Sequence, residues 1–231
     1  MKKRALIIIL CIAVLSTLSA CNRAAGHPVR PKAAYKDILA GFREVLSSPE
    51  STENVYDGMY GVYEVIQALG DTAADTVGYA YNDLNQDGQK ELLIGNFEST
   101  GTSDIKNDLY AAYTYEDGAP EPLFEKQKRN AYALTDTGTL YFYGSDGVAF
   151  HIVAEYEMTE EGIVCKDFYF SYPKYGDINE IEYFHNTTGE WDPKVSEKVD
   201  MTFEQLEQIR KELAARTVSI DAELLADTGK K

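Results

Sequence analysis

The sequence predicts an α+β fold in which two N-terminal helices precede an antiparallel β-meander and a C-terminal helix. Apolar residues first recur at helical spacing, over Tyr35–Leu46 and again over Val55–Leu69. After Asp71 the period changes to two, as in the alternation over Val148–Met158. Because turn signals separate the alternating stretches, we expect successive strands to pair antiparallel.

Each predicted helix has an apolar stripe and an end signal. The first carries Tyr35, Ile38, Leu39, Phe42 and Leu46 and ends near Pro49. The second carries Val55, Met59, Val62, Ile66 and Leu69 and stops at Gly70. The last has Thr202 as N-cap, Gln205 at the capping-box position, and Leu206, Ile209 and Leu213 inside.

The meander is predicted from seven short segments with strand character. These are Thr76–Asn82, Leu92–Asn96, Leu109–Tyr115, Leu140–Tyr143, Val148–Met158, Val164–Phe170 and Ile181–Phe184. No internal repeat of propeller length is visible, so we expect one α+β domain over residues 34–231. We expect its polar tail to fray after about residue 217.

Residues 1–20 have the organisation of a signal peptide: a basic start followed by an apolar run too short to span a bilayer. Leu18-Ser19-Ala20-Cys21 resembles the bacterial lipobox, which implies acylation of Cys21 (palmitate or a similar lipid). Residues 21–33 would then be a flexible tether, and the domain would lie on the extracytoplasmic face of the cell membrane. The alternative is an ordinary signal peptide followed by a chance cysteine.

Charge and cysteine content narrow the possible partners. The formal charge of −16 argues against nucleic acid as a partner and against an anionic bilayer bound through the fold. Cys11 lies in the signal peptide and Cys21 is the lipidation candidate, so Cys165 has no disulfide partner. We expect Cys165 to be a structural thiol.

An oxygen-rich loop over residues 83–91 predicts calcium as cofactor. Calcium takes about six to eight oxygen ligands, which a short loop presents at alternate positions. The candidate ligands are Asp83, Asn85 and Asp87 at loop positions 1, 3 and 5, the Gln89 carbonyl at position 7 and Glu91 at position 9. Gly88 permits the sharp turn. The alternative is a polar hairpin loop that uses Asp and Gly only for turn chemistry.

The loop resembles the calcium loops of FG-GAP and VCBS repeats, which join two strands. It departs from an EF-hand because Ile94 stands at position 12, where a bidentate Glu is expected. We therefore expect a dissociation constant on the order of 10⁻⁴ to 10⁻³ M, as in extracellular modules. That affinity suits a structural clamp.

The chain as a whole resembles a group of uncharacterised Gram-positive surface lipoproteins. They share the lipobox, the pair of N-terminal helices, the calcium loop and the tyrosine-rich strands. The specific match is Tyr79–Gly95. The resemblance brings no known activity with it. Our first hypothesis is a membrane-anchored, calcium-stabilised binding or interaction module at the cell envelope, with a glycan, peptide or envelope protein as ligand. A carboxylate-dependent cell-wall or polysaccharide hydrolase is the alternative, and a purely structural envelope component is a third hypothesis. We predict no catalytic residues, because no nucleophile elbow, zinc-ligand spacing or phosphate loop occurs.

Overall fold

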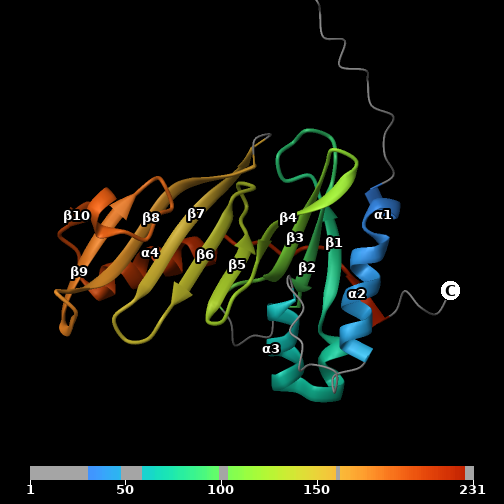
Figure 1. Ribbon diagram of the computed structural model, residues 1–231, viewed down its shortest axis with the longest axis horizontal. Helices are drawn as coiled ribbons and strands as arrows, with labels where there is room; N and C mark the ends of the chain where they lie inside the picture. Colours follow the sequence, from blue (N-terminus) through green and yellow to red (C-terminus); the bar gives the residue numbers. More distant parts are fainter. Residues whose placement is uncertain (1–30, 48–58, 99–103, 160–161, 227–231) are drawn as a thin grey trace, which may run out of the picture.

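The computed structural model describes residues 31–47, 59–98, 104–159 and 162–226, and an antiparallel sheet of eleven strands runs through it (Figure 1). The strands are β1 (Gly78–Asn82), β2 (Glu91–Asn96), β3 (Asp108–Glu116), β4 (Ala119–Glu125), β5 (Asn130–Leu134), β6 (Leu140–Ser145), β7 (His151–Thr159), β8 (Gly162–Lys174), β9 (Asp177–Asn186), β10 (Glu197–Val199) and β11 (Glu223–Leu224). The helices are α1 (Pro31–Ala34), α2 (Lys36–Ser47), α3 (Tyr60–Leu69) and α4 (Phe203–Ala215), with 3₁₀ turns η2 (Gly70–Asp75) and η3 (Pro193–Val195). The prediction of a mixed fold with a large antiparallel sheet and a C-terminal helix is confirmed.

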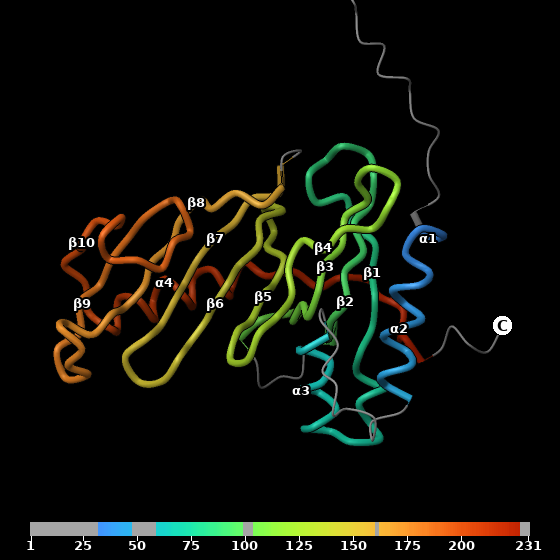
Figure 2. Tube along the Cα trace, in the orientation of Figure 1, coloured from blue at the N-terminus to red at the C-terminus, as the bar shows by residue number. Residues whose placement is uncertain are grey.

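Strand order largely follows chain order, as the back-and-forth course of the chain in Figure 2 shows. From one edge to the other the strands run β10-β9-β8-β7-β6-β5-β3-β2-β1-β11, and β4 pairs with β3 off this path. Neighbouring segments along the chain therefore make most of the pairings, as expected for a meander.

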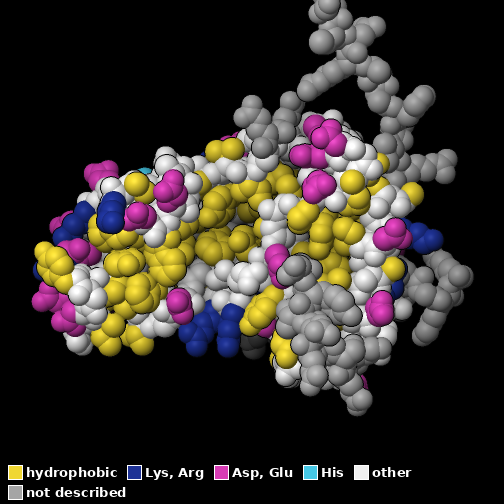
Figure 3. All heavy atoms as spheres, in the orientation of Figure 1, with side chains coloured by type: hydrophobic (Ala, Val, Ile, Leu, Met, Phe, Trp, Pro, Cys, Tyr) yellow, Lys and Arg dark blue, Asp and Glu magenta, His cyan; other side chains and the backbone are white. Residues whose placement is uncertain are grey.

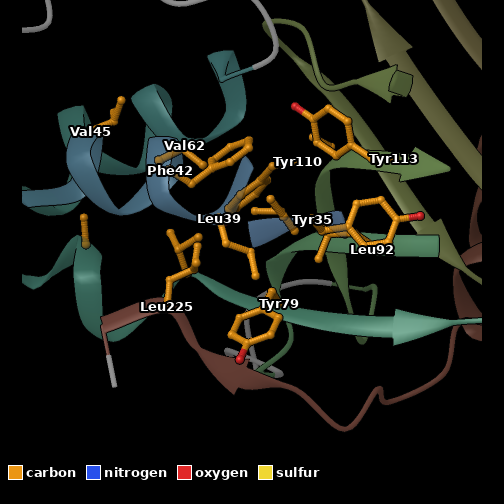
Figure 4. Packing of buried hydrophobic residues seen from close by; sticks show 14 of the residues in the cluster. Tyr35, Leu39, Phe42, Val45, Val62, Tyr79, Leu92, Tyr110, Tyr113 and Leu225 are labelled. Atoms are coloured by element: carbon orange, nitrogen blue, oxygen red, sulfur yellow. The ribbon is translucent and has the colours of Figure 1, made fainter. Parts of the chain in front are cut away.

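The three long helices of the described residues, α2, α3 and α4, cover one face of the sheet, which we call the helical face. α2 and α3 cover its β1–β3 part, where Leu39 and Phe42 pack against Leu92 and Tyr110 (Figure 4). α4 covers the β5–β7 part through Leu206, Leu213 and Ala214, which contact Ala133, Tyr141 and Val153. Each helix is held by burial of its apolar stripe.

The predicted capping box starts α4. The Gln205 N–H donates to Thr202 Oγ1 at 3.3 Å, and the Thr202 N–H donates to Gln205 Oε1 at 2.8 Å. Two N–H groups that the first helical turn cannot satisfy thus find partners.

The opposite face of the sheet is aromatic over β5–β9. We call it the aromatic face and define it by Tyr132, Phe142, Ile152, Tyr156, Phe168, Phe170 and Phe184. Cross-strand pairs such as Phe142–Ala154 and Phe170–Phe184 place these side chains together. No described helix covers this face, and Figure 3 shows an apolar band along it.

The segment after residue 217 corrects the prediction of a frayed tail. The Val218 N–H donates to the Leu134 carbonyl at 3.0 Å, and β11 pairs with β1. Leu225 is fully buried among the α2 and β1 side chains. Three apolar residues, Val218, Ile220 and Leu225, lie too far apart for a periodic signal, but their burial holds the segment in place.

Several sequence predictions fall on residues that are not described. The signal peptide, Cys21, most of the tether and the Val55–Gly58 start of the second predicted helix lie outside the described residues. Within the described residues, no helix has the length and apolar character needed to cross a membrane.

Candidate calcium loop

The loop of residues 83–90 joins β1 to β2 as a hairpin connection. Asn82 pairs with Glu91 across its base, so a strand flanks the loop on each side. Gln86 (φ 60°) and Gly88 (φ 88°) both adopt the left-handed conformation that turns the chain sharply. The loop therefore lies between two paired strands.

Each side-chain ligand candidate within the turn accepts a hydrogen bond from the loop's own backbone. Asp83 Oδ2 accepts from the Gly88 N–H at 3.1 Å. Asn85 Oδ1 accepts from the Asp87 N–H at 3.1 Å, and Asp87 Oδ1 accepts from the Gln89 N–H at 2.7 Å. These contacts gather the oxygens of positions 1, 3 and 5 around one turn, and they are also the turn chemistry of Asp and Asn.

Glu91 lies below the turn as the first residue of β2, and only 1% of its surface is exposed. Its Oε2 accepts from the Leu84 N–H at 2.7 Å, and its Oε1 accepts from Thr114 Oγ1 at 3.4 Å. Glu91 thus fastens the loop to β3.

Asp83 carries the one feature of the loop that its internal hydrogen bonds do not explain. Its Oδ1 is shielded from solvent, and no hydrogen-bond donor among the described residues reaches it. A buried carboxylate oxygen without a partner costs free energy, so such an atom calls for an explanation such as a bound ion. In the described arrangement, no three His, Cys, Asp or Glu side chains converge closely enough to hold a metal ion.

Glu91 is the carboxylate of the loop whose proton affinity is raised. Burial raises the pKa of Glu91, and the charges of Asp87 and Asp83 raise it further, against the hydrogen bond from Leu84. Burial also raises the pKa of Tyr35, with Glu91 and Asp87 adding to the effect. The loop therefore has a negative potential that a divalent cation would relieve.

Two contacts from outside the loop are not predictable from the sequence. Tyr35 Oη donates to the Lys90 carbonyl at 3.3 Å from a position 55 residues away, and Thr114 contacts Glu91 from β3. No local pattern signals either contact, because only the packing of α2 and β3 against this hairpin creates it.

A cluster of charged groups between the sheet and α4 bears on the hydrolase alternative. Glu155 and Asp167 are cross-strand partners in a cavity of about 250 Å³ that Arg216 also lines. Burial would raise the pKa of Glu155, but hydrogen bonds from Thr139 and Arg216 outweigh it and hold the pKa below its usual value. A general acid of glycoside hydrolysis needs a raised pKa. Glu155 is therefore unsuited to that role.

Cys165 lies half-buried on β8, where burial and then the charge of Asp167 raise the pKa of its thiol to about 11. A thiol with so high a pKa is a poor nucleophile at neutral pH.

No protein-family model matches the chain, and no curated protein or solved structure matches it either.

Proposed function

We propose that this chain is an extracytoplasmic lipoprotein that is anchored through Cys21, binds calcium in the β1–β2 loop, and serves as a binding module at the cell envelope. The observation that carries the calcium assignment is the buried, unpartnered Asp83 Oδ1. Asp83, Asn85 and Asp87 supply hard oxygen atoms, which suit calcium better than zinc or copper.

Calcium binding in this loop would compete with its internal hydrogen bonds. Asp83 Oδ2 and both carboxylate oxygens of Asp87 accept hydrogen bonds within the loop, whereas no donor among the described residues reaches Asp83 Oδ1. Asp83, Asn85, Asp87 and the Gln89 carbonyl would hold the ion, and Glu91 would contribute charge beside it. When bound, the ion neutralises the carboxylates and ties β1 to β2.

The first test is thermal unfolding of the purified protein in calcium, magnesium or EDTA. With about 1 mM calcium and a dissociation constant of about 0.1 mM, binding adds about 1.4 kcal/mol to the free energy of unfolding. For a chain of this size that gain corresponds to a rise of about 3 to 6 °C in the melting temperature. The Asp83→Asn variant should lose the calcium-specific rise.

Asp117→Asn is the matched control, because Asp117 also lies in a hairpin turn, the one between β3 and β4, where its own φ is 48°. It should keep the full calcium response. If wild type shows the same melting temperature in calcium and EDTA, the loop is a polar turn and the calcium assignment is wrong.

The second test addresses the anchor. A Cys21→Ser variant expressed in a Gram-positive host should move from the membrane fraction to the medium or soluble fraction, because the acylation site is gone. Cys165→Ser is the control and should remain with the membrane. Equal membrane association of wild type and Cys21→Ser would contradict the lipid anchor.

A further inference from the structure

A pocket of about 450 Å³ opens on the aromatic face at the sheet end where the β4–β5 turn lies. Its lining combines a polar side, formed by Lys128, Arg129 and Asn130, with an aromatic side, formed by Phe142, Phe150 and Trp191. The volume is within the range of small-molecule sites, roughly 300–1,000 Å³. Figure 3 shows the apolar band ending beside a group of Lys and Arg side chains.

Trp191 forms a firmly supported aromatic wall. Its ring meets the Phe150 ring edge to face, with centroids 5.5 Å apart and planes at 86°. Even so, 39% of its surface stays exposed. A partly exposed indole is a natural platform for the C–H face of a sugar ring.

The β9–β10 connection holds Trp191 in place through Asn186, which is only 8% exposed. Asn186 Nδ2 donates to the Glu190 carbonyl and to Ser196 Oγ, both at 2.8 Å. Its Oδ1 accepts from the N–H groups of Thr188 and Gly189. Because the connection is already ordered, a ligand on Trp191 need not order it, which favours binding.

The basic side of the pocket is unusual for this acidic chain. In the described part of the chain, neither Lys128 nor Arg129 has a carboxylate within ion-pair distance. Arg129 is set in a tight turn with φ 61°, which the Asn130 N–H closes by donating to the Gln127 carbonyl at 3.1 Å. Two adjacent cations without an internal partner can pair with an anion from outside.

Gly144 also lines the pocket, and its missing side chain lets Asn130 and the Phe142 ring pack closely over this part of β6. A Cβ at this position would lie 3.0 Å from both Asn130 Oδ1 and the Phe142 ring. β6 thus lacks a side chain at the point where the polar and aromatic sides meet.

We propose that this pocket binds an acidic glycan, with a sugar ring stacked on Trp191 and a carboxylate or phosphate ester held by Arg129 and Lys128. Asn130 and Asp146 provide polar groups for sugar hydroxyls at the same mouth. The inference rests on the proposed function as a binding module and names its ligand class.

Trp191 makes the test direct, because it is the only tryptophan in the chain. Its fluorescence is followed while hexagalacturonate, glucose 6-phosphate, neutral maltohexaose or single-stranded hexathymidylate is added in the presence of calcium. The two acidic sugar probes distinguish a carboxylate from a phosphate ligand. We expect at least one of them to change the emission in a saturable way, and maltohexaose to bind about tenfold more weakly or not at all.

Variants then assign the contacts. Lys128→Gln/Arg129→Gln should weaken binding of the acidic probe about tenfold or more. Lys36→Gln/Lys211→Gln makes the same change in net charge at exposed sites on α2 and α4, and should leave binding unchanged. All of these side chains are exposed, so each variant should keep the wild-type melting temperature.

Three results would overturn the acidic-glycan assignment. They are equal affinity for maltohexaose and the acidic sugars, tighter binding of hexathymidylate, and no emission change with either acidic sugar up to about 10 mM. Repeating the titration on Asp83→Asn separates the two hypotheses. The calcium response can fail while the pocket still binds, and the pocket can fail while the calcium response persists.

Discussion

An Arg216→Ala variant is expected to melt about 6 to 12 °C below wild type, because it leaves a buried carboxylate without its main cation. Glu155 is 8% exposed on β7, and Arg216 Nη2 donates to its Oε1 at 3.2 Å. Arg216 Nη2 also donates to Thr137 Oγ1 at 2.6 Å. Removing one partner of a buried pair costs about 3 to 5 kcal/mol. We expect the low end of this range, about 3 kcal/mol, since the Arg216 side chain is 34% exposed and Lys166 remains 3.8 Å from Glu155.

The pH dependence of this loss identifies its cause. The folded-state pKa of Glu155 lies below the usual 4.5, so its ionised form stabilises the fold above pH 4.5. That contribution disappears as the pH falls through the folded-state pKa. The melting difference between wild type and Arg216→Ala should therefore be full at pH 7 and shrink in acid, where Glu155 takes up a proton in both proteins.

Two further variants distinguish loss of the Arg216–Glu155 pair from loss of any positive charge on the surface. Lys174→Ala breaks a solvent-exposed pair with Glu180 and should leave the melting temperature nearly unchanged. Arg216→Ala/Glu155→Gln removes the uncompensated charge and should recover part of the stability. A double variant no more stable than Arg216→Ala would mean that Arg216 acts through packing rather than charge.

Elements with strong periodicity were predictable from sequence, and short or proline-bearing ones were not. The alternation over Val148–Met158 predicts most of β7, and the capping box predicts the start of α4. β4 was missed because Pro120 and Pro122 interrupt its pattern. These prolines are tolerated because β4 pairs only with β3 and thus lies at an edge. β11 was missed because two residues carry no period.

The same distinction holds for the sites. Asp83, Asn85 and Asp87 lie within five residues, so sequence spacing alone was enough to bring them into one turn. The pocket at Trp191 draws Arg129, Phe142 and Phe150 from separate strands and turns. No local motif links these residues, because strand order and the course of the β9–β10 connection alone create their proximity.

Gly95→Ala is expected to destabilise the fold by about 3 kcal/mol, at the upper end of the usual cost of overpacking. A Cβ on Gly95 would lie 2.3 Å from the Asp108 carbonyl oxygen and 3.0 Å from Leu109 Cα. Both obstacles are backbone atoms of the paired strand, at the point where the β2–β3 register shifts between Ile94 and Gly95. They cannot rotate away as a side chain would, so the strands must separate.

Gly41→Ala is the matched control, since the same substitution there meets only the flexible end of Met59 at 3.2 Å. Gly41 lies inside α2, where alanine is favoured over glycine by about 1 kcal/mol, so this variant should melt at or above the wild-type temperature. Comparing both variants in calcium and EDTA then tests how the loop is coupled to its strand. The calcium loop leads directly into β2, which begins at Glu91 and contains Gly95. A distortion at Gly95 should therefore weaken the calcium response as well as the fold. A Gly95→Ala protein with wild-type stability would show that β2 and β3 can separate at the bulge without disturbing the rest of the sheet.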